Sequence, residues 1–303
     1  MQIDDIKKVL VVGAGTMGYQ IAWQCALSGY DVILFDLTRD ILENAMRRIE
    51  RLLQKKLSLE VISPQEAGRI RKRISTSIDP QEAGVCADLL SESIPEDPDL
   101  KSIIFAQFNI ICPVHTIFTT NTSSLVPSMI AEATGRPAQF AALHFHDVRV
   151  SNVVDIMPHP GTSPETVECL RAFAERISQI AIVLQKEHPG YVFNTMLMAL
   201  LKAAQTLAAN GITSYQDIDR AWMGVMGTTI GPFGIMDSIG LDTVWKVLDF
   251  WAPHTGDPQD LINTDFLKQY VDRGAKGNKT GQGFYSYPNP AYMQKDFLLG
   301  KKA

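Results

Sequence analysis

Short apolar runs alternate with amphipathic segments in the first part of the chain. The runs at 7–12, 31–35, 88–94, 116–120, 139–145 and 179–184 have the length and composition of buried strands. Helical periodicity lies near 39–57, 64–73, 99–109, 125–133 and 164–177. Such alternation is typical of a mostly parallel sheet with helices on both faces. We therefore predict a doubly wound, Rossmann-type α/β domain, from which the charged stretch 39–73 projects as a helical hairpin.

The pattern becomes purely helical near His188. A long apolar helix is predicted over 191–209, and helical periodicity continues at 215–226, 240–251 and 259–273. The sequence thus predicts a first domain over 1–187 and a smaller all-α domain over 188–303. The helix over 191–209 is apolar on nearly all sides. That pattern favours burial between domains or subunits, although the core of a helical domain would explain it too.

Composition and charge narrow the class of protein. The chain has 303 residues, of which 46% are hydrophobic and 20% are charged, enough for two globular domains. Its net charge of −5 argues against nucleic acid as the main partner. We find no apolar run long enough for a membrane span and no signal-peptide pattern at the N-terminus. The four cysteines are scattered, as reduced thiols of a cytoplasmic protein would be.

A Gly-x-Gly-x-x-Gly motif stands between the first predicted strand and a helix. Gly13 permits a tight turn, Gly15 lets the backbone approach a pyrophosphate, and Gly18 lets the helix pack against the strand. Asp36 follows about 20 residues later at the end of the next strand, where a carboxylate accepts both ribose hydroxyls of NAD. The negative charge of Asp36 favours NAD over NADP, but nearby Arg39 could bind the 2′-phosphate of NADP. The glycine motif alone leaves FAD open.

Two histidines mark a possible catalytic centre. A nicotinamide enzyme that oxidises an alcohol needs a base, and histidine titrates near neutral pH. His144 and His146 end the apolar run 139–145, and their spacing puts them on one face of a strand. Asp147 or Asp155 could orient an imidazole, whereas a plain pair of hydrogen-bonded histidines is an equally good interpretation. No metal site is predicted, because neither CxxC nor HExxH occurs and the carboxylates lack metal-ligand spacing.

Two further segments carry polar groups with an open role. The hydroxyls and the amide of 119–124 could line a site beside a nicotinamide, or Ser123 could simply cap a helix that begins near Leu125. A basic stripe lies on one face of the predicted helix over 39–57. Such a stripe is usually a solvated surface, but it could instead meet the phosphates of a carrier such as CoA. Its members are Arg47, Arg48, Arg51, Lys55 and Lys56.

Seven separated segments, in order, match one family over essentially the whole chain. By these segments the chain resembles the 3-hydroxyacyl-CoA dehydrogenases, in particular the stand-alone bacterial 3-hydroxybutyryl-CoA type. The matching segments are 11–18 (VVGAGTMG), 92–96 (ESIPE) with Lys101, 120–124 (TNTSS), 143–145 (LHF), 189–194 (PGYVFN), 231–234 (GPFG) and 281–285 (GQGFY).

The resemblance implies roles position by position. His144 would be the catalytic acid/base with Asp155 as its carboxylate partner, and Ser123 and Asn194 would hydrogen-bond the substrate oxygen and the histidine. Glu96 and Lys101 would contact the nicotinamide ribose. A basic residue of the stripe would meet the CoA end of an acyl-CoA substrate, and the helical domain would form a homodimer. The implied NAD-binding residues are Gly13, Gly15, Thr16, Met17, Gly18, Asp36, Glu96, Lys101 and Asn121; the implied CoA contacts are Arg48, Arg51 and Lys55.

The chain departs from the family pattern beside the catalytic histidine. The family commonly has His-Phe-Phe-Asn-Pro, where this chain has His144-Phe145-His146-Asp147-Val148. Asp155 replaces a glutamate, with one residue fewer in between. Either the shorter loop restores the geometry, or the shorter acid orients the ring less well. Two alternatives therefore stay open: a dehydrogenase of a small free 3-hydroxy acid such as a sugar acid, and a non-catalytic NAD-binding protein.

Overall fold

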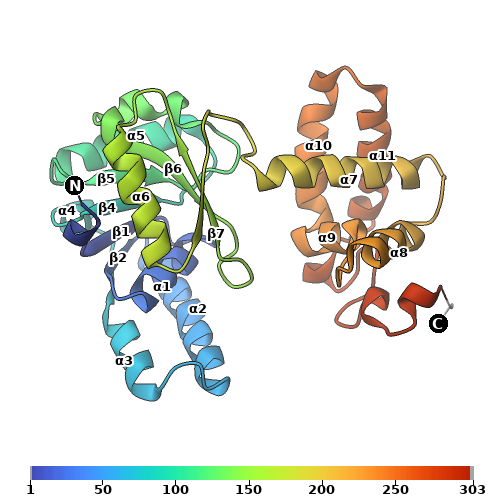
Figure 1. Ribbon diagram of the computed structural model, residues 1–303, viewed down its shortest axis with the longest axis horizontal. Coiled ribbons are helices and arrows are strands. Elements are labelled where there is room, and N and C mark those ends of the chain that lie inside the picture. Colours follow the sequence, from blue (N-terminus) through green and yellow to red (C-terminus); the bar gives the residue numbers. More distant parts are fainter. Residues whose placement is uncertain (1, 301–303) are drawn as a thin grey trace. The chain divides into compact units, whose positions relative to one another are not determined.

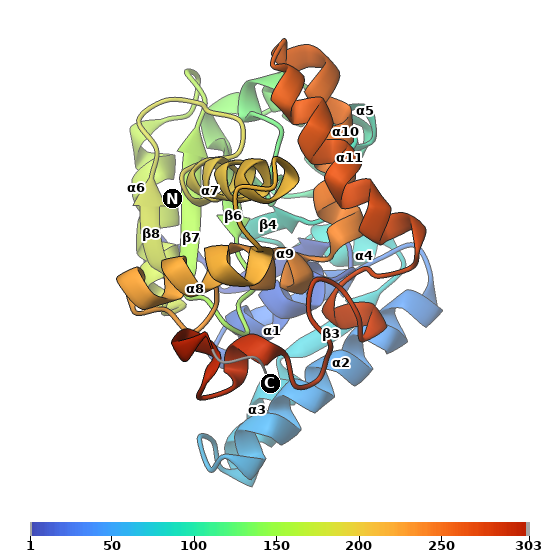
Figure 2. The ribbon, with the colours of Figure 1, turned by 90° about the vertical axis from the view of Figure 1, so that its right-hand side faces the viewer.

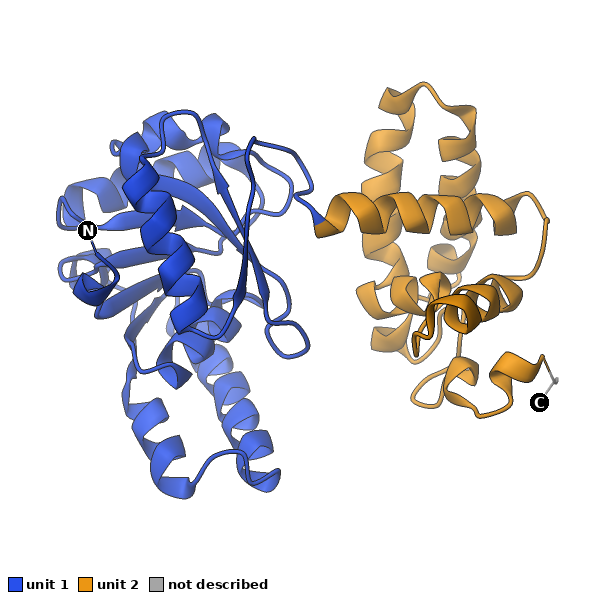
Figure 3. Ribbon diagram, in the orientation of Figure 1, with its two compact units in different colours: residues 1–192 blue, residues 193–303 orange. Residues whose placement is uncertain are grey.

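The computed structural model describes residues 2–300. It forms two compact units, 1–192 and 193–303 (Figure 3). The change of sequence pattern had placed the boundary between 187 and 188. None of the described helices is long and apolar enough to cross a membrane.

An eight-stranded sheet organises the first unit (Figure 1). The strand order is β3-β2-β1-β4-β5-β6-β7-β8, and every pair is parallel except β6 with β7. This arrangement confirms the predicted Rossmann-type α/β class. The strands are β1 (Lys8–Val12), β2 (Asp31–Phe35), β3 (Ile74–Ser77), β4 (Leu89–Glu92), β5 (Ile117–Thr120), β6 (Phe140–Phe145), β7 (Val153–Pro158) and β8 (Ile180–Val183).

Helices cover both faces because successive strand side chains point to opposite sides. In β1, Val9 and Val11 pack into the core under one set of helices, and Leu10 and Val12 pack into the core on the other face. The first core includes side chains of α1 (Gly18–Leu27), α2 (Arg39–Ser58), α3 (Pro64–Lys72) and α6 (Pro164–Arg176). The second includes those of α4 (Pro80–Gly84) and α5 (Pro98–Ile111). As predicted, α2 and α3 form a hairpin that extends beyond the sheet in both views (Figures 1 and 2).

One predicted helix is wrong. The stretch 125–133 forms two short 3₁₀ turns, Pro127–Met129 and Ala131–Thr134. Ser123 therefore caps no α-helix there; instead the Thr122 hydroxyl oxygen accepts a hydrogen bond from the Leu125 N–H at 3.0 Å.

The second unit is all-helical within its described residues, apart from isolated bridges at Gln282. It contains α7 (Phe193–Ala209), α8 (Tyr215–Met226), α9 (Pro232–Ile239), α10 (Leu241–Thr255) and α11 (Pro258–Asp272), and α10 and α11 lie side by side (Figure 2). Two buried carboxylates in this unit accept hydrogen bonds from backbone N–H groups distant in the sequence. Asp219 accepts hydrogen bonds from the N–H groups of Phe233 and Gly234, in the first turn of α9. Asp237 accepts from the N–H groups of Phe284 and Tyr285.

Candidate active site

The glycine turn joins β1 to α1 at the carboxyl edge of the sheet. Gly13 has φ +97°, and a Cβ there would lie 2.6 Å from the Ser93 carbonyl oxygen. A Cβ on Gly18 would lie 1.7 Å from the Gly13 carbonyl oxygen, so no larger residue fits at this helix start. Nothing lies within 4 Å of a Cβ built on Gly15. The turn thus leaves open space at Gly15, where the sequence motif predicts the pyrophosphate. The next residue, Thr16, is exposed.

Asp36 is fixed beside this turn. It follows β2 and is half-buried; its Oδ2 accepts a hydrogen bond from the Ala14 N–H at 2.7 Å. Its Oδ1 accepts from the Leu37 N–H, also at 2.7 Å. Each carboxylate oxygen has a further lone pair for a hydroxyl donor. The sequence reasoning anticipated the acid but not its bond to the glycine turn.

A buried ion pair lies under the end of β4. The Lys101 ammonium is 2.7 Å from Glu92 Oε1 and 3.4 Å from Glu96 Oε2, and the Lys101 side chain is only 1% exposed. Glu92 also accepts hydrogen bonds from the Thr120 hydroxyl and the Ile94 N–H. Burial raises the pKa of Glu92 although Lys101 opposes the rise. Lys101 is therefore held among carboxylates inside the protein, whereas the Glu96 side chain is 35% exposed.

Glu96 organises the polar segment after β5. Its Oε1 accepts hydrogen bonds from the Thr122 hydroxyl and from the N–H groups of Ser123 and Ser124. Partial burial favours protonation, but these donors and Lys101 outweigh it and lower the pKa of Glu96. Asn121, in the same segment, accepts the Phe145 N–H at 2.7 Å and so joins this loop to the end of β6. Ser123 is exposed.

His144 and Asp155 face each other across β6 and β7. They are register partners in the antiparallel pair, and His144 Nδ1 lies 3.1 Å from Asp155 Oδ2. Both are buried, and the Tyr191 ring packs against the imidazole with centroids 4.6 Å apart. The loop with one residue fewer therefore does bring the shorter acid within hydrogen-bond distance. Burial opposes ionisation of Asp155, but hydrogen bonds from His144 and His146 outweigh it and lower its pKa.

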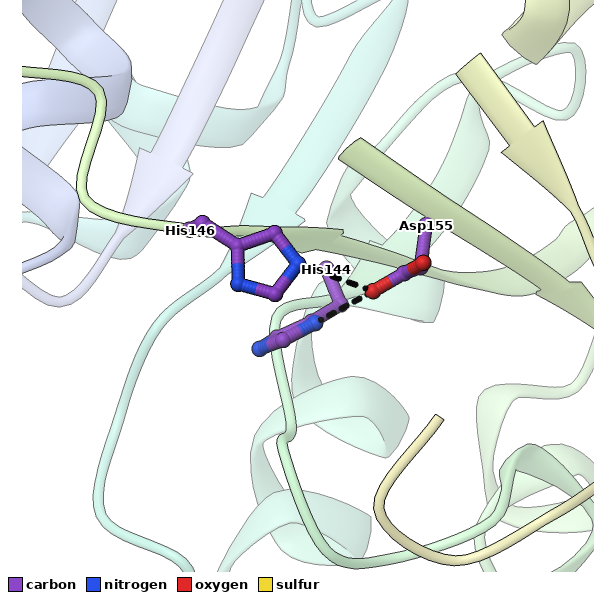
Figure 4. Close-up of side chains that lie close together, drawn as sticks. All are labelled: His144, His146 and Asp155. Atoms are coloured by element: carbon purple, nitrogen blue, oxygen red, sulfur yellow. Dashed lines mark hydrogen bonds and ion pairs between the residues drawn. The ribbon is translucent and has the colours of Figure 1, made fainter. Parts of the chain in front are cut away.

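His146 reaches the same carboxylate oxygen. Its Nε2 lies 3.1 Å from Asp155 Oδ2, and the two imidazole centroids are 4.7 Å apart. Figure 4 shows the Asp155 oxygen between one nitrogen of each ring. Asp147, the other acid considered from sequence, instead pairs with Arg149, whose Nε is 2.7 Å from Asp147 Oδ1. The predicted shared face is confirmed, but nothing in the sequence pattern indicated that both rings would share Asp155.

Other predicted site residues come from α7 and α2. Asn194 is the second residue of α7 and belongs to the second unit, so its proposed contact with His144 stays a prediction. Arg48, Arg51 and Lys55 are exposed on α2, and none of them forms an ion pair with a carboxylate in the described range. The Arg48 guanidinium lies 5.4 Å from the centroid of the Tyr19 ring.

Comparison with known proteins covers nearly the whole chain. Residues 8–188 match the family model of the 3-hydroxyacyl-CoA dehydrogenase NAD binding domain, and residues 190–287 match that of the C-terminal domain. The mitochondrial hydroxyacyl-coenzyme A dehydrogenase of Sus scrofa is 35% identical, with 93% of this chain and 91% of that protein covered.

Solved structures agree with this match. A diketoreductase described as acting on dicarbonyl compounds is 37% identical, with a TM-score of 0.86 and coverage of 93% of this chain and 99% of that one. The (S)-3-hydroxybutyryl-CoA dehydrogenase of Ralstonia eutropha is 28% identical, with a TM-score of 0.84 and coverage of 94% and 100%. These matches confirm the expected dehydrogenase class and NAD as its cofactor. The chain belongs to the 3-hydroxyacyl-CoA dehydrogenase family.

Proposed function

We propose that the protein interconverts a (3S)-3-hydroxyacyl-CoA and its 3-oxoacyl-CoA with NAD, and that the acyl chain is short, as in 3-hydroxybutyryl-CoA. The observation that carries this proposal is the 3.1 Å contact between His144 Nδ1 and Asp155 Oδ2. It holds an imidazole at the end of β6 in a fold that binds NAD at this edge. The name of the Ralstonia relative supports the short chain.

The proposed chemistry is a proton transfer coupled to hydride transfer. His144 Nε2 accepts the proton of the substrate hydroxyl, while Asp155 accepts the Nδ1–H hydrogen bond. Asp155 thereby fixes the tautomer with a free Nε2 lone pair and stabilises the imidazolium that forms. Bound NAD would supply the acceptor for the hydride from C3. In the reverse direction His144 returns the proton to the alkoxide oxygen.

The remaining assignments complete this proposal. Ser123 and Asn194 hydrogen-bond the substrate oxygen and the histidine, and Glu96 contacts the nicotinamide ribose. We place Lys101 behind Glu96 as a positioning residue, because its ammonium is buried between two carboxylates. The exposed cations of α2 contact CoA phosphates. We further propose a cytoplasmic homodimer that serves fatty acid metabolism.

One comparison of substrates tests the function. NADH oxidation should be fast with acetoacetyl-CoA and much slower with free acetoacetate or with the oxidised forms of sugar acids. Because CoA adds binding energy far from the reacting carbon, the gap should be largest in kcat/KM. Equal rates with and without CoA would overturn the proposal, and no turnover with any of these substrates would favour a non-catalytic NAD-binding protein.

A second candidate is a dehydrogenase of a small free carbonyl substrate. The 37% identity to a diketoreductase that acts on dicarbonyl compounds favours it. The two functions differ in what the cations of α2 do, since a free acid or diketone would not need them. Fast reduction of free dicarbonyl compounds, unaffected by changes in these cations, would support this candidate.

A further inference from the structure

The cluster at Asp155 contains more ligand atoms than the proposed proton transfer uses. His144, His146 and Asp155 each offer one atom, and the three atoms lie within 4.8 Å of one another (Figure 4). His144 lies in β6, His146 directly follows that strand, and the carboxylate comes from the neighbouring strand β7. Two histidine nitrogens and a carboxylate oxygen are a donor set that Zn²⁺ and related divalent transition metals prefer.

The distances suit such an ion. Ligand atoms placed 2.0–2.2 Å from a tetrahedral Zn²⁺ are about 3.3–3.6 Å apart. His144 Nδ1 and His146 Nε2 each lie 3.1 Å from Asp155 Oδ2, so these two separations need to lengthen by only a few tenths of an ångström. All three ligand atoms lie within 4.8 Å of one another. Asp155 is 1% exposed, whereas the His146 side chain is 14% exposed. His146 is therefore the most exposed of the three side chains.

We propose that His144, His146 and Asp155 bind a divalent transition-metal ion such as Zn²⁺, and that the bound ion inhibits the enzyme reversibly. The metal site stands on the geometry of the three side chains. Only the inhibition rests on the function proposed above. His146 decides the site, because without it one imidazole and one carboxylate remain, too few for a stable zinc site.

Inhibition follows from where the protons of His144 go. Without metal, Nδ1–H donates to Asp155 and the Nε2 lone pair accepts the substrate proton. When neutral His144 forms an Nδ1–metal bond, the Nδ1 proton moves to Nε2 and none is released. Nε2 then carries a hydrogen and has no lone pair for the hydroxyl proton. Neutral His146 shifts its own proton from Nε2 to Nδ1 in the same way.

Binding is measured first, without reference to activity. The full chain is stripped with EDTA, dialysed and titrated with Zn²⁺ by calorimetry and with Co²⁺ by visible absorption. We expect one ion per chain and the absorption bands of low-symmetry Co²⁺. The variant H146Q keeps an N–H donor toward Asp155 but removes the imidazole. Loss of a second-layer partner already costs 10–100-fold in metal affinity, so H146Q should bind at least about 100-fold more weakly.

His115 supplies the matched control. Its Nε2 lies 3.2 Å from Asp88 Oδ1 on an exposed part of the first unit, so H115Q removes a histidine–aspartate contact elsewhere. H115Q should bind Zn²⁺ as the wild type does. Absence of saturable binding in the wild type, or equal binding by H146Q and the wild type, would overturn the metal site and leave Asp155 as a shared hydrogen-bond acceptor.

Turnover then tests inhibition. Zn²⁺ should stop wild-type NADH oxidation, EDTA should restore it, and H146Q should keep its own metal-free rate at the same Zn²⁺ concentration. If calorimetry shows His146-dependent binding while turnover continues, the inhibition is refuted and the site stands. If the protein has no dehydrogenase activity, the proposed function fails, and calorimetry still decides the metal site.

Discussion

At the scale of single residues, His144 depends on one oxygen of Asp155 for its orientation. His144→Ala should lower kcat by about 10²–10⁴-fold, the usual cost of losing a general acid/base, and Asp155→Asn should also lower kcat by favouring the wrong tautomer. NADH binding, followed by fluorescence, should stay near the wild-type value in both.

His146→Ala is the comparison for these variants in metal-free buffer. It leaves the contact between His144 and Asp155 in place and should cost much less in kcat. If His146→Ala abolished turnover and His144→Ala did not, the acid/base assignment would be wrong, while the fold and family would stand.

Asp36 should decide the choice between the two nicotinamide cofactors. Its carboxylate is held at the glycine turn by the Ala14 N–H, so it cannot easily swing away from a 2′-phosphate. A like-charge contact of this kind costs several kcal/mol, and the wild type should strongly prefer NADH to NADPH. Asp36→Ser should bring the kcat/KM for NADH and the kcat/KM for NADPH closer together. Equal use of both cofactors by the wild type would contradict this assignment.

The residues of the site were predictable to different degrees. His144, Asp36 and the glycines follow from strand ends and motif spacing. Two features do not: the burial of Lys101 between Glu92 and Glu96, and the contact of His146 with Asp155. Both depend on side-chain directions and on how a loop returns, and neither leaves a periodic signal in one sequence. The CxxC and HExxH patterns likewise do not include His144 and His146, whose shared carboxylate comes from the next strand.

At the scale of elements, α2 offers a test of CoA binding with an internal control. Arg48, Arg51 and Lys55 are exposed and form no ion pair within the described residues, whereas Arg47, on the same face, lies 3.7 Å from Glu43 and donates to Asn44 Oδ1 at 2.7 Å. Replacing the first three by Ala should raise KM for acetoacetyl-CoA and weaken its salt dependence, because phosphate contacts are lost. Arg47→Ala should have a smaller effect on both, because its guanidinium is already paired with Glu43 and Asn44. Unchanged kinetics in the triple variant would make this face an ordinary solvated surface.

The elements that sequence reasoning missed have physical reasons in common. β3 is a four-residue edge strand with only two buried side chains, so its apolar signal is weak. β7 is interrupted by the buried polar Asp155, which breaks the apolar run. Gly231-Pro232 indicated an interruption, but Pro232 begins α9, where its missing N–H costs nothing. Over 125–133 the helical spacing of apolar residues was misleading, and Gly135 ends that segment with φ +65°.

At the scale of the whole molecule, buried Asp219 links stability to pH. Burial raises the pKa of Asp219 from 3.8 to about 6, so the folded state favours its protonated form. The stability that the folded state gains from protonated Asp219 is fully present below about pH 4 and is lost as pH rises through 6. The unfolding free energy of the wild type minus that of Asp219→Asn should be about 1.4 kcal/mol larger at pH 5 than at pH 8. Urea unfolding of both proteins at the two pH values measures this gap, in which other titrating groups cancel. A gap that is constant, or that grows with pH, would contradict the protonated Asp219.

The second unit carries exposed apolar side chains that bear on the oligomeric state. Large apolar side chains on α10 and α11 are exposed, among them Phe250 at 63% and Trp251 at 54%. Exposed apolar side chains that gather on one surface usually mark an interface. Light scattering should therefore give about twice the 33.5 kDa of one chain. Phe250→Asp with Trp251→Glu should shift the mass toward one chain, whereas Val114→Asp, at an exposed apolar residue of the first unit, should leave the dimer intact. A wild type that stays at the mass of one chain at micromolar concentration would rule out the homodimer, and a dimer unaffected by the double variant would place the interface on another surface.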